Sequence, residues 1–187
     1  MKRNYAEITP QIVEMTNKLK ENNYIDPKLY IEHKVNRGLR DLDGNGVLTG
    51  LTEISEVNAK KVVDGKTVPS AGELYYRGYN IKDLVSGFIS DDRYGFEEIV
   101  YLLLLGDLPN KQELESFNKI LADYRTLPNS FTRDVIMKAP SENMMNSLAR
   151  SVLTLYSYDK NAEDTSLENV MRQSLQLVAL FPLLSVC

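Results

Sequence analysis

Residues 96–109 have the sequence Phe96-Glu97-Glu98-Ile99-Val100-Tyr101-Leu102-Leu103-Leu104-Leu105-Gly106-Asp107-Leu108-Pro109. Glu97 and Glu98 stand where the first turn of a helix favours negative charge, because the helix dipole is positive at that end. The segment 99–105 is apolar around almost the whole helix circumference, which is typical of a buried helix. Gly106 fits a C-terminal cap, and Pro109 follows shortly after it. This stretch therefore predicts a core helix with both ends defined.

Helical patterns continue from this stretch towards the C-terminus. Asn110 and Glu113 have the spacing of a capping box, with Asn in place of the usual Ser or Thr, so the next helix begins there. Leu127-Pro128 ends it. We expect further helices over about 131–139 and 143–158, a polar loop over 160–165, and a last helix capped by Ser166.

The N-terminal part combines two helices with a small region of extended chain. Thr9-Pro10 is a helix start signal, and the apolar residues that follow predict a helix from residue 10 to about 22. Asp26-Pro27 repeats the start signal for a short second helix. Residues 51–57 alternate apolar and polar, and Asp64-Gly65 is a turn signal, so the segment 47–79 is predicted to be β-rich. A short helix over 81–88 follows.

Composition limits the classes of function. The chain has 187 residues, 43% of them hydrophobic and 26% charged, as in ordinary globular proteins. A net charge of −4 without a Lys/Arg cluster argues against nucleic acid as a partner. The single cysteine, Cys187, excludes a disulfide within the chain and favours the cytoplasm. The apolar segment 175–187 is interrupted by polar residues and is too short to predict a membrane span.

Few residues suggest chemistry. Asp41, Asp43, Asn45 and Gly46 match the first half of an EF-hand calcium loop, but the twelfth position is a threonine and Glu53 comes one residue late. A simple Asp/Asn/Gly turn explains them better, and no metal site is predicted. The only histidine, His33, cannot form a multi-histidine site. Arg37 and Arg40 fit either a helix C-terminus or a clamp for a phosphate or carboxylate. From the residues alone, the chain is a mainly α-helical protein with a small β region.

Three segments in order do resemble a known family. They are Gly46-Val47 with Gly50, Thr52 and Ile54-Ser55; then Gly72-Glu73-Leu74 with Tyr76-Arg77-Gly78-Tyr79, Ile81 and Asp83-Leu84; then Phe96-Glu97-Glu98 with Leu102-Leu103-Leu104, Gly106 and Leu108-Pro109. This series is similar to the N-terminal third to half of the citrate synthase family, over roughly residues 38–187. Residues 1–37 resemble the extended N-terminus of some bacterial members.

The resemblance implies a multi-helical large domain, represented here by its N-terminal part, with the β excursion near residues 47–79. It divides the chain into an N-terminal helical segment, 1–45, and a partial large domain, 46–187. It also implies a homodimer that condenses acetyl-CoA with oxaloacetate at the entry to the tricarboxylic acid cycle. The small molecules are substrates, and no separate cofactor is expected. Propionyl-CoA, as in 2-methylcitrate synthases, is the alternative acyl donor.

The catalytic residues of that family are expected to lie outside this chain. The family uses an aspartate base and histidines that stabilise the enolate and polarise the oxaloacetate carbonyl, in motifs such as Gly-Pro-Leu-His-Gly-Gly, which do not occur here. The resemblance carries over only Arg40, as a contact to a CoA phosphate. The apolar, uncapped C-terminal end, 178–187, also favours truncation inside a larger protein over a buried terminal helix. We therefore expect the chain to be inactive by itself. A non-catalytic helical interaction module is the other hypothesis.

Overall fold

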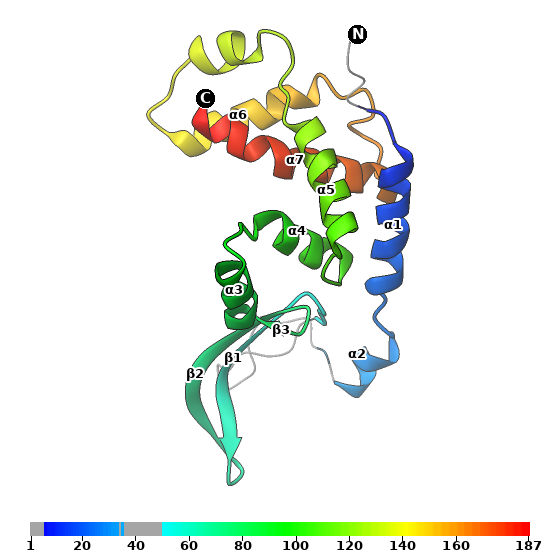
Figure 1. Cartoon of the computed structure of the whole chain (residues 1–187), viewed down its shortest axis with the longest axis vertical. Helices are drawn as coiled ribbons and strands as arrows, with labels where there is room; N and C mark the ends of the chain where they lie inside the picture. The colour runs from blue at the N-terminus through cyan, green and yellow to red at the C-terminus, as the bar shows by residue number, and fades with distance from the viewer. Residues whose placement is uncertain (1–5, 34, 36–49) are drawn as a thin grey trace. The chain divides into compact units, whose positions relative to one another are not determined.

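The computed structural model of the chain describes residues 6–33, 35 and 50–187. It divides the chain into two compact units, Met1–Asn17 with Lys111–Cys187, and Lys18–Asn110. Helix α1 (Pro10–Asn22) begins in the first unit and ends in the second. The fold is mainly α-helical with a small antiparallel sheet, as the sequence predicts (Figure 1).

The first unit is a group of helices. After the beginning of α1 it contains α5 (Lys111–Tyr124), the π-helix η1 (Thr132–Met137), α6 (Met144–Tyr156) and α7 (Leu167–Val186). Helix α7 contacts both α5 and α6, and α6 contacts η1. Phe131, Leu180 and Leu184 form a buried core that is surrounded by partly buried apolar side chains of η1, α6 and α7. Burial of these side chains from water is the main term that holds the helices together.

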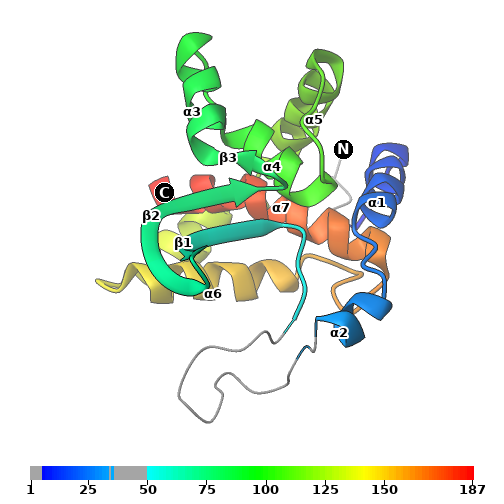
Figure 2. The same cartoon turned by 90° about the horizontal axis from the view of Figure 1, so that it is seen from below.

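The second unit combines helices with the sheet. It contains α2 (Lys28–Glu32), the strands β1 (Ser55–Val63), β2 (Lys66–Tyr76) and β3 (Tyr79–Asn80), and the helices α3 (Ile81–Ser90) and α4 (Phe96–Leu105). The strands form an antiparallel sheet in the order β1-β2-β3. Figure 2 shows β1 and β2 as a long curved hairpin, with α3 near the end at which β3 joins β2.

Several predicted boundaries are confirmed. Helix α1 has the predicted bounds, and α4 ends at Gly106, which has the left-handed conformation of a C-cap at φ 93°. Asp64 and Gly65 both have positive φ and join β1 to β2, as a two-residue hairpin turn requires. Ser166 accepts a hydrogen bond from the backbone N–H of Asn169 and caps α7.

Other elements differ from the predictions in their bounds or type. The first strand begins at Ser55 and runs to Val63, so the alternation in 51–57 marked its start but not its length. The predicted helix over 131–139 is a π-helix from Thr132 to Met137. Helix α7 continues to Val186 although Pro182 lies inside it. In α4, Tyr101, Leu102 and Leu105 are buried and the other apolar residues are partly exposed, so the prediction of a fully buried helix is only partly correct.

Among the helices of the described residues, none combines the length and the apolar character that a membrane crossing requires. The division of the chain at residue 45 stays a prediction, because residues 36–49 lie outside the described part.

Candidate functional site

Arg77 lies at the centre of the most distinctive polar site of the second unit. It forms the two-residue turn between β2 and β3 together with Gly78, and both residues have positive φ, 49° and 84°. Glycine accepts this conformation freely, but an arginine in it costs on the order of 1–3 kcal/mol. The backbone N–H of Arg77 donates to the carbonyl of Ile54 at 2.9 Å. This hydrogen bond therefore connects the strained turn to the residue directly before β1.

The guanidinium of Arg77 joins two further segments to this turn. Its Nη2 donates to Oδ1 of Asn23 at 2.6 Å and to the carbonyl oxygen of Leu103 in α4 at 2.9 Å. Its Nε is buried and has no hydrogen-bond partner in the described part of the chain. These bonds offset the cost of the turn, since a hydrogen bond from a charged donor stabilises by about 1.5–3 kcal/mol.

Asn22 makes a second connection beside the first. Its Nδ2 donates to the carbonyl of Leu105 at 2.7 Å and to Oδ2 of Asp107 at 3.2 Å. The Leu105 carbonyl belongs to the last turn of α4, where helix carbonyls have no partner within the helix. A Cβ on Gly106 would lie 2.8 Å from Cβ of Asn22, so this close approach requires glycine.

These residues line a polar pocket that is widely open to solvent. It is lined by Asn22, Glu53, Arg77, Gly106 and Asp107 and has a volume of about 340 Å³. A guanidinium supplies donors and two carboxylates supply acceptors, so the pocket suits a small polar group that carries both kinds of atom. The described residues of its lining thus combine one guanidinium and one amide with two carboxylates and a glycine.

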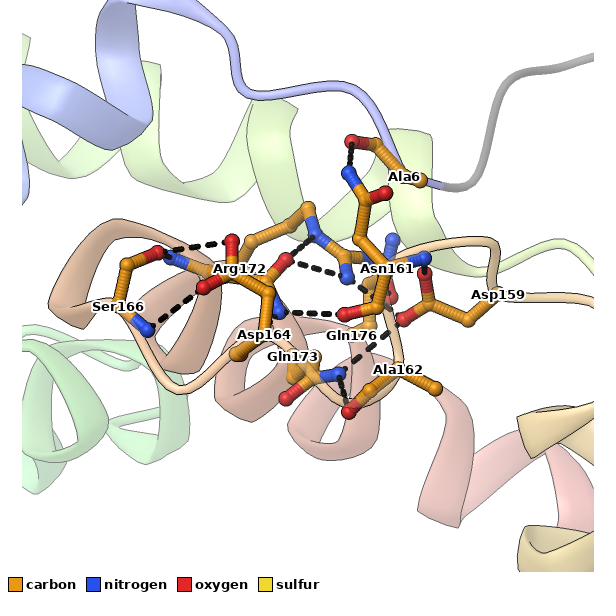
Figure 3. Close-up of polar contacts among 10 residues, drawn as sticks. Ala6, Asp159, Asn161, Ala162, Asp164, Ser166, Arg172, Gln173 and Gln176 are labelled. Carbon is orange, nitrogen blue, oxygen red and sulfur yellow. Dashed lines mark hydrogen bonds and ion pairs between the residues drawn. The ribbon is translucent and has the colours of Figure 1, made fainter.

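A second polar cluster lies in the first unit around Arg172 of α7, whose side chain is fully buried (Figure 3). Its Nη2 donates to Oδ2 of Asp159 at 2.6 Å and its Nη1 to Gln176 at 2.9 Å. Its Nε donates to Oδ1 of Asn169 at 2.9 Å. Each guanidinium nitrogen therefore has a protein partner, as a buried arginine requires.

The cluster fastens the loop between α6 and α7. Asn169 donates to the carbonyls of Asn161 and Asp164 at 2.8 and 2.7 Å, and Gln173 donates to Asp159 and to the carbonyl of Ala162 at 3.2 Å (Figure 3). Burial raises the pKa of Asp159, but hydrogen bonds from Arg172, from the N–H of Asn161 and from Gln173 outweigh it, and the pKa lies below its ordinary value. This arrangement stabilises the loop and its donors are satisfied, so we assign it a structural role.

Most of the residues singled out in the sequence lie outside the part of the chain that the structure describes. Arg37, Arg40 and the calcium-like segment 41–46 lie outside the described residues. His33 is exposed and caps the C-terminus of α2. Residues 6–33, 35 and 50–187 contain no group of three or more His, Cys, Asp or Glu side chains that could hold a metal ion.

Neither polar site is evident from sequence patterns. Arg77 belongs to the Tyr-Arg-Gly-Tyr motif, and an arginine before glycine in a two-residue turn is an uncommon choice, which is the one local signal of this site. Arg172 is a charge within the apolar part of a helix that follows a loop rich in Asn and Asp, which is a weaker signal.

Residues 38–187 match the protein family described as citrate synthase, C-terminal domain. 2-Methylcitrate synthase 1 of Corynebacterium glutamicum is 27% identical over 152 residues, which cover 81% of this chain and 34% of that protein. Citrate synthase of Saccharolobus solfataricus is 31% identical over 127 residues, covering 67% of this chain and 30% of that protein.

The similarity extends to three dimensions. The crystal structure of citrate synthase from Pyrobaculum aerophilum matches with a TM-score of 0.57 and 27% identity, covering 78% of this chain and 36% of that one. The chain thus spans about a third of the length of the relatives that it matches.

Proposed function

The chain belongs to the citrate synthase family, and from this membership we propose that it is part of an enzyme that condenses an acyl-CoA with oxaloacetate. The observation that carries the proposal is the continuous family match over residues 38–187. Within that match, the hydrogen bond from Arg77 to the carbonyl of Leu103 joins the Tyr-Arg-Gly-Tyr segment to the segment Phe96–Pro109.

Acetyl-CoA is the acyl donor that we propose, with citrate as the product and entry to the tricarboxylic acid cycle as the role. Propionyl-CoA is the second candidate, because the relatives include 2-methylcitrate synthases of Corynebacterium glutamicum at 27% and 30% identity. The two donors differ by one methylene, which a pocket distinguishes by about 1–3 kcal/mol. The choice between them is therefore made by the residues around the acyl group.

We further propose that the 187 residues alone are inactive. The condensation needs a base for the methyl proton of the acyl group and donors that stabilise the enolate and polarise the oxaloacetate carbonyl. The only histidine, His33, is exposed at the end of a five-residue helix. The chain would supply scaffold, with Arg40 as a contact to a CoA phosphate.

In this proposal the whole enzyme is a cytoplasmic homodimer without a separate cofactor. Two other hypotheses from the sequence remain distinct from it. A non-catalytic helical module would bind a longer subunit and perform no chemistry. A calcium-binding protein would gain thermal stability when calcium is added, because a ligand that binds only the folded state stabilises it.

The test is the release of free CoA thiol. The purified chain and a longer protein that contains it are each mixed with oxaloacetate and either acetyl-CoA or propionyl-CoA. We expect thiol release from the longer protein only, with the larger kcat/KM for acetyl-CoA. Release by the 187-residue chain would contradict the assignment of the chemistry to other segments. If neither protein releases thiol, the proposal of a condensing enzyme is contradicted and the hypothesis of a non-catalytic interaction module is supported.

A further inference from the structure

Arg77 is bonded to both ends of one long segment of the second unit. Its Nη2 donates to Oδ1 of Asn23, which directly follows α1, at 2.6 Å. Its backbone N–H donates to the carbonyl of Ile54, directly before β1, at 2.9 Å. Helix α2 and the rest of segment 24–53 lie between these two contacts in the sequence. The hydrogen bonds of Arg77 therefore close the base of segment 24–53.

The amide of Asn23 is oriented for its contact with Arg77. Its Nδ2 donates to the carbonyl of Leu19 at 2.8 Å. That carbonyl lies in the last turn of α1, where helix carbonyls have no partner within the helix. Because Nδ2 is engaged in this way, Oδ1 faces the guanidinium as the acceptor. One side of the amide thus ends the helix, and the other attaches the departing chain to the β2–β3 turn.

The other end of the segment is fixed beside the first. The N–H of Ile54 donates to Oγ1 of Thr52 at 3.1 Å, while its carbonyl accepts from Arg77. Glu53 and Asn22 line the same open pocket. The pocket lining places residues 22 and 53 close together independently of the bonds that Arg77 makes. Both ends of the segment are therefore held at one place in the second unit.

A segment that is fixed at both ends samples fewer conformations than one that is held at a single end. In the proposed function, segment 24–53 carries Arg40, the contact to a CoA phosphate. Arg40 lies outside the described residues, whereas both ends of the segment lie within them. We propose that Arg77 is a positioning residue for acyl-CoA binding, which acts by closing the base of segment 24–53. This role rests on the proposed function and adds a residue that does not itself touch the substrate.

A simpler role for Arg77 is to cap α4. Its Nη2 also donates to the carbonyl of Leu103, and a cation is favourable at the C-terminal end of a helix. That role gives no part to Asn23. Variants of Asn23 separate the two roles, because they leave Arg77 and Leu103 unchanged. N23A removes the bonds to both Arg77 and Leu19, whereas N23D keeps an acceptor for Arg77 and loses only the donor.

Hydrogen exchange of the full chain measures the closure directly. The amides of His33 and Val35 donate to carbonyls of α2. In N23A they should exchange roughly tenfold faster, because a bond from a charged donor is lost. N23D should exchange like the wild type, and N23Q, which displaces the amide by one methylene, should lie between them. The control is D159N, which destabilises the first unit instead and should leave these amides unchanged.

Titration calorimetry tests the consequence for the substrate in a longer protein that contains this chain. N23A should weaken the binding of acetyl-CoA roughly fivefold. N23D should retain most of the affinity, and D159N should bind acetyl-CoA normally. The affinity for oxaloacetate should be the same in all variants. A purely structural role for the contact would not distinguish acetyl-CoA from oxaloacetate, so this selectivity is the result that supports a positioning role.

The two readouts separate the ways in which the inference can fail. Unchanged exchange in N23A, or exchange that rises equally in α2, α6 and α7, would overturn the closure of the segment by Arg77. An unchanged affinity for acetyl-CoA in N23A, or an equal loss in N23D, would overturn the link to acyl-CoA binding. A wild type that binds no acetyl-CoA would instead contradict the proposed function, while hydrogen exchange would still decide whether the base is closed.

Discussion

The guanidinium Nη2 of Arg77 lies 2.9 Å from the carbonyl oxygen of Leu103 and donates a hydrogen bond to it. This bond joins the β2–β3 turn to helix α4, two elements that carry the two most specific family motifs. The same nitrogen donates to Asn23, which directly follows α1. One side chain therefore holds three segments in place, and the strained backbone of Arg77 is stable only because these partners fix it.

Replacement of Arg77 by alanine should destabilise the chain by about 2–4 kcal/mol, because both guanidinium bonds are lost while the left-handed turn remains. Arg77→Gly loses the same hydrogen bonds, but glycine adopts a positive φ without strain. It should therefore lower the free energy of unfolding by about 1 kcal/mol less than Arg77→Ala does. Urea unfolding followed by circular dichroism measures both variants. A loss below about 0.5 kcal/mol for Arg77→Ala, as at an ordinary surface position, would show that the three-way connection is unimportant.

Two glycines should respond in opposite ways to the same substitution. Gly106→Ala should cost about 1–3 kcal/mol, because φ is 93° and the new Cβ would lie 2.8 Å from Cβ of Asn22. Gly87→Ala lies inside α3, where nothing is within 4 Å of the new Cβ, and should stabilise by about 0.5–1 kcal/mol. Thermal melting of both variants gives the comparison. Shifts of the same sign would contradict this account of Gly106.

The sequence predicted those parts of the fold that depend on local signals. Helix α1, the C-cap Gly106 and the Asp64-Gly65 turn are each determined by a few neighbouring residues. The length of β1 was not predictable in the same way, because its exposed residues carry little pattern and pairing with β2 determines where it ends. The π-helix η1 has the sequence pattern of an ordinary helix, so the sequence does not distinguish its i→i+5 hydrogen bonds from those of an α-helix.

The polar sites depend on contacts between distant residues. Arg77 bonds to Asn23 across 54 positions and to Leu103 across 26. Spacing rules along one helix or strand do not describe such contacts. The family resemblance, which the comparisons confirm, marked the segment that contains Arg77 but not its role.

Asp159 should make the stability of the first unit depend on pH. Its pKa is lower in the folded chain than in the unfolded chain, where the value is about 3.9. The ionised carboxylate therefore stabilises the fold above that pH, and the contribution is lost as the pH falls through the lower, folded-state pKa. Asp159→Asn should cost about 2–3 kcal/mol at pH 7, because it leaves the buried Arg172 without its anion.

The check on Asp159 is a series of urea unfolding curves for wild type and Asp159→Asn from pH 7 to pH 3. The difference in unfolding free energy should be constant above about pH 5 and decrease below it. The control is Glu115→Gln, which removes an exposed carboxylate on α5 and should change stability by less than about 0.5 kcal/mol. A difference that stays constant down to pH 3 would exclude this role of the carboxylate charge.

Arg40 gives a prediction about substrate binding that uses an active enzyme containing this chain. If its guanidinium contacts a CoA phosphate, Arg40→Ala should raise the KM for the acyl-CoA roughly tenfold and leave kcat nearly unchanged, because uniform binding energy is lost. The KM for oxaloacetate should not change. Arg37→Ala removes the same charge three positions earlier and separates a specific contact from general attraction. Equal increases in KM for the two variants would indicate general attraction, and an unchanged KM in Arg40→Ala would remove Arg40 from the binding site.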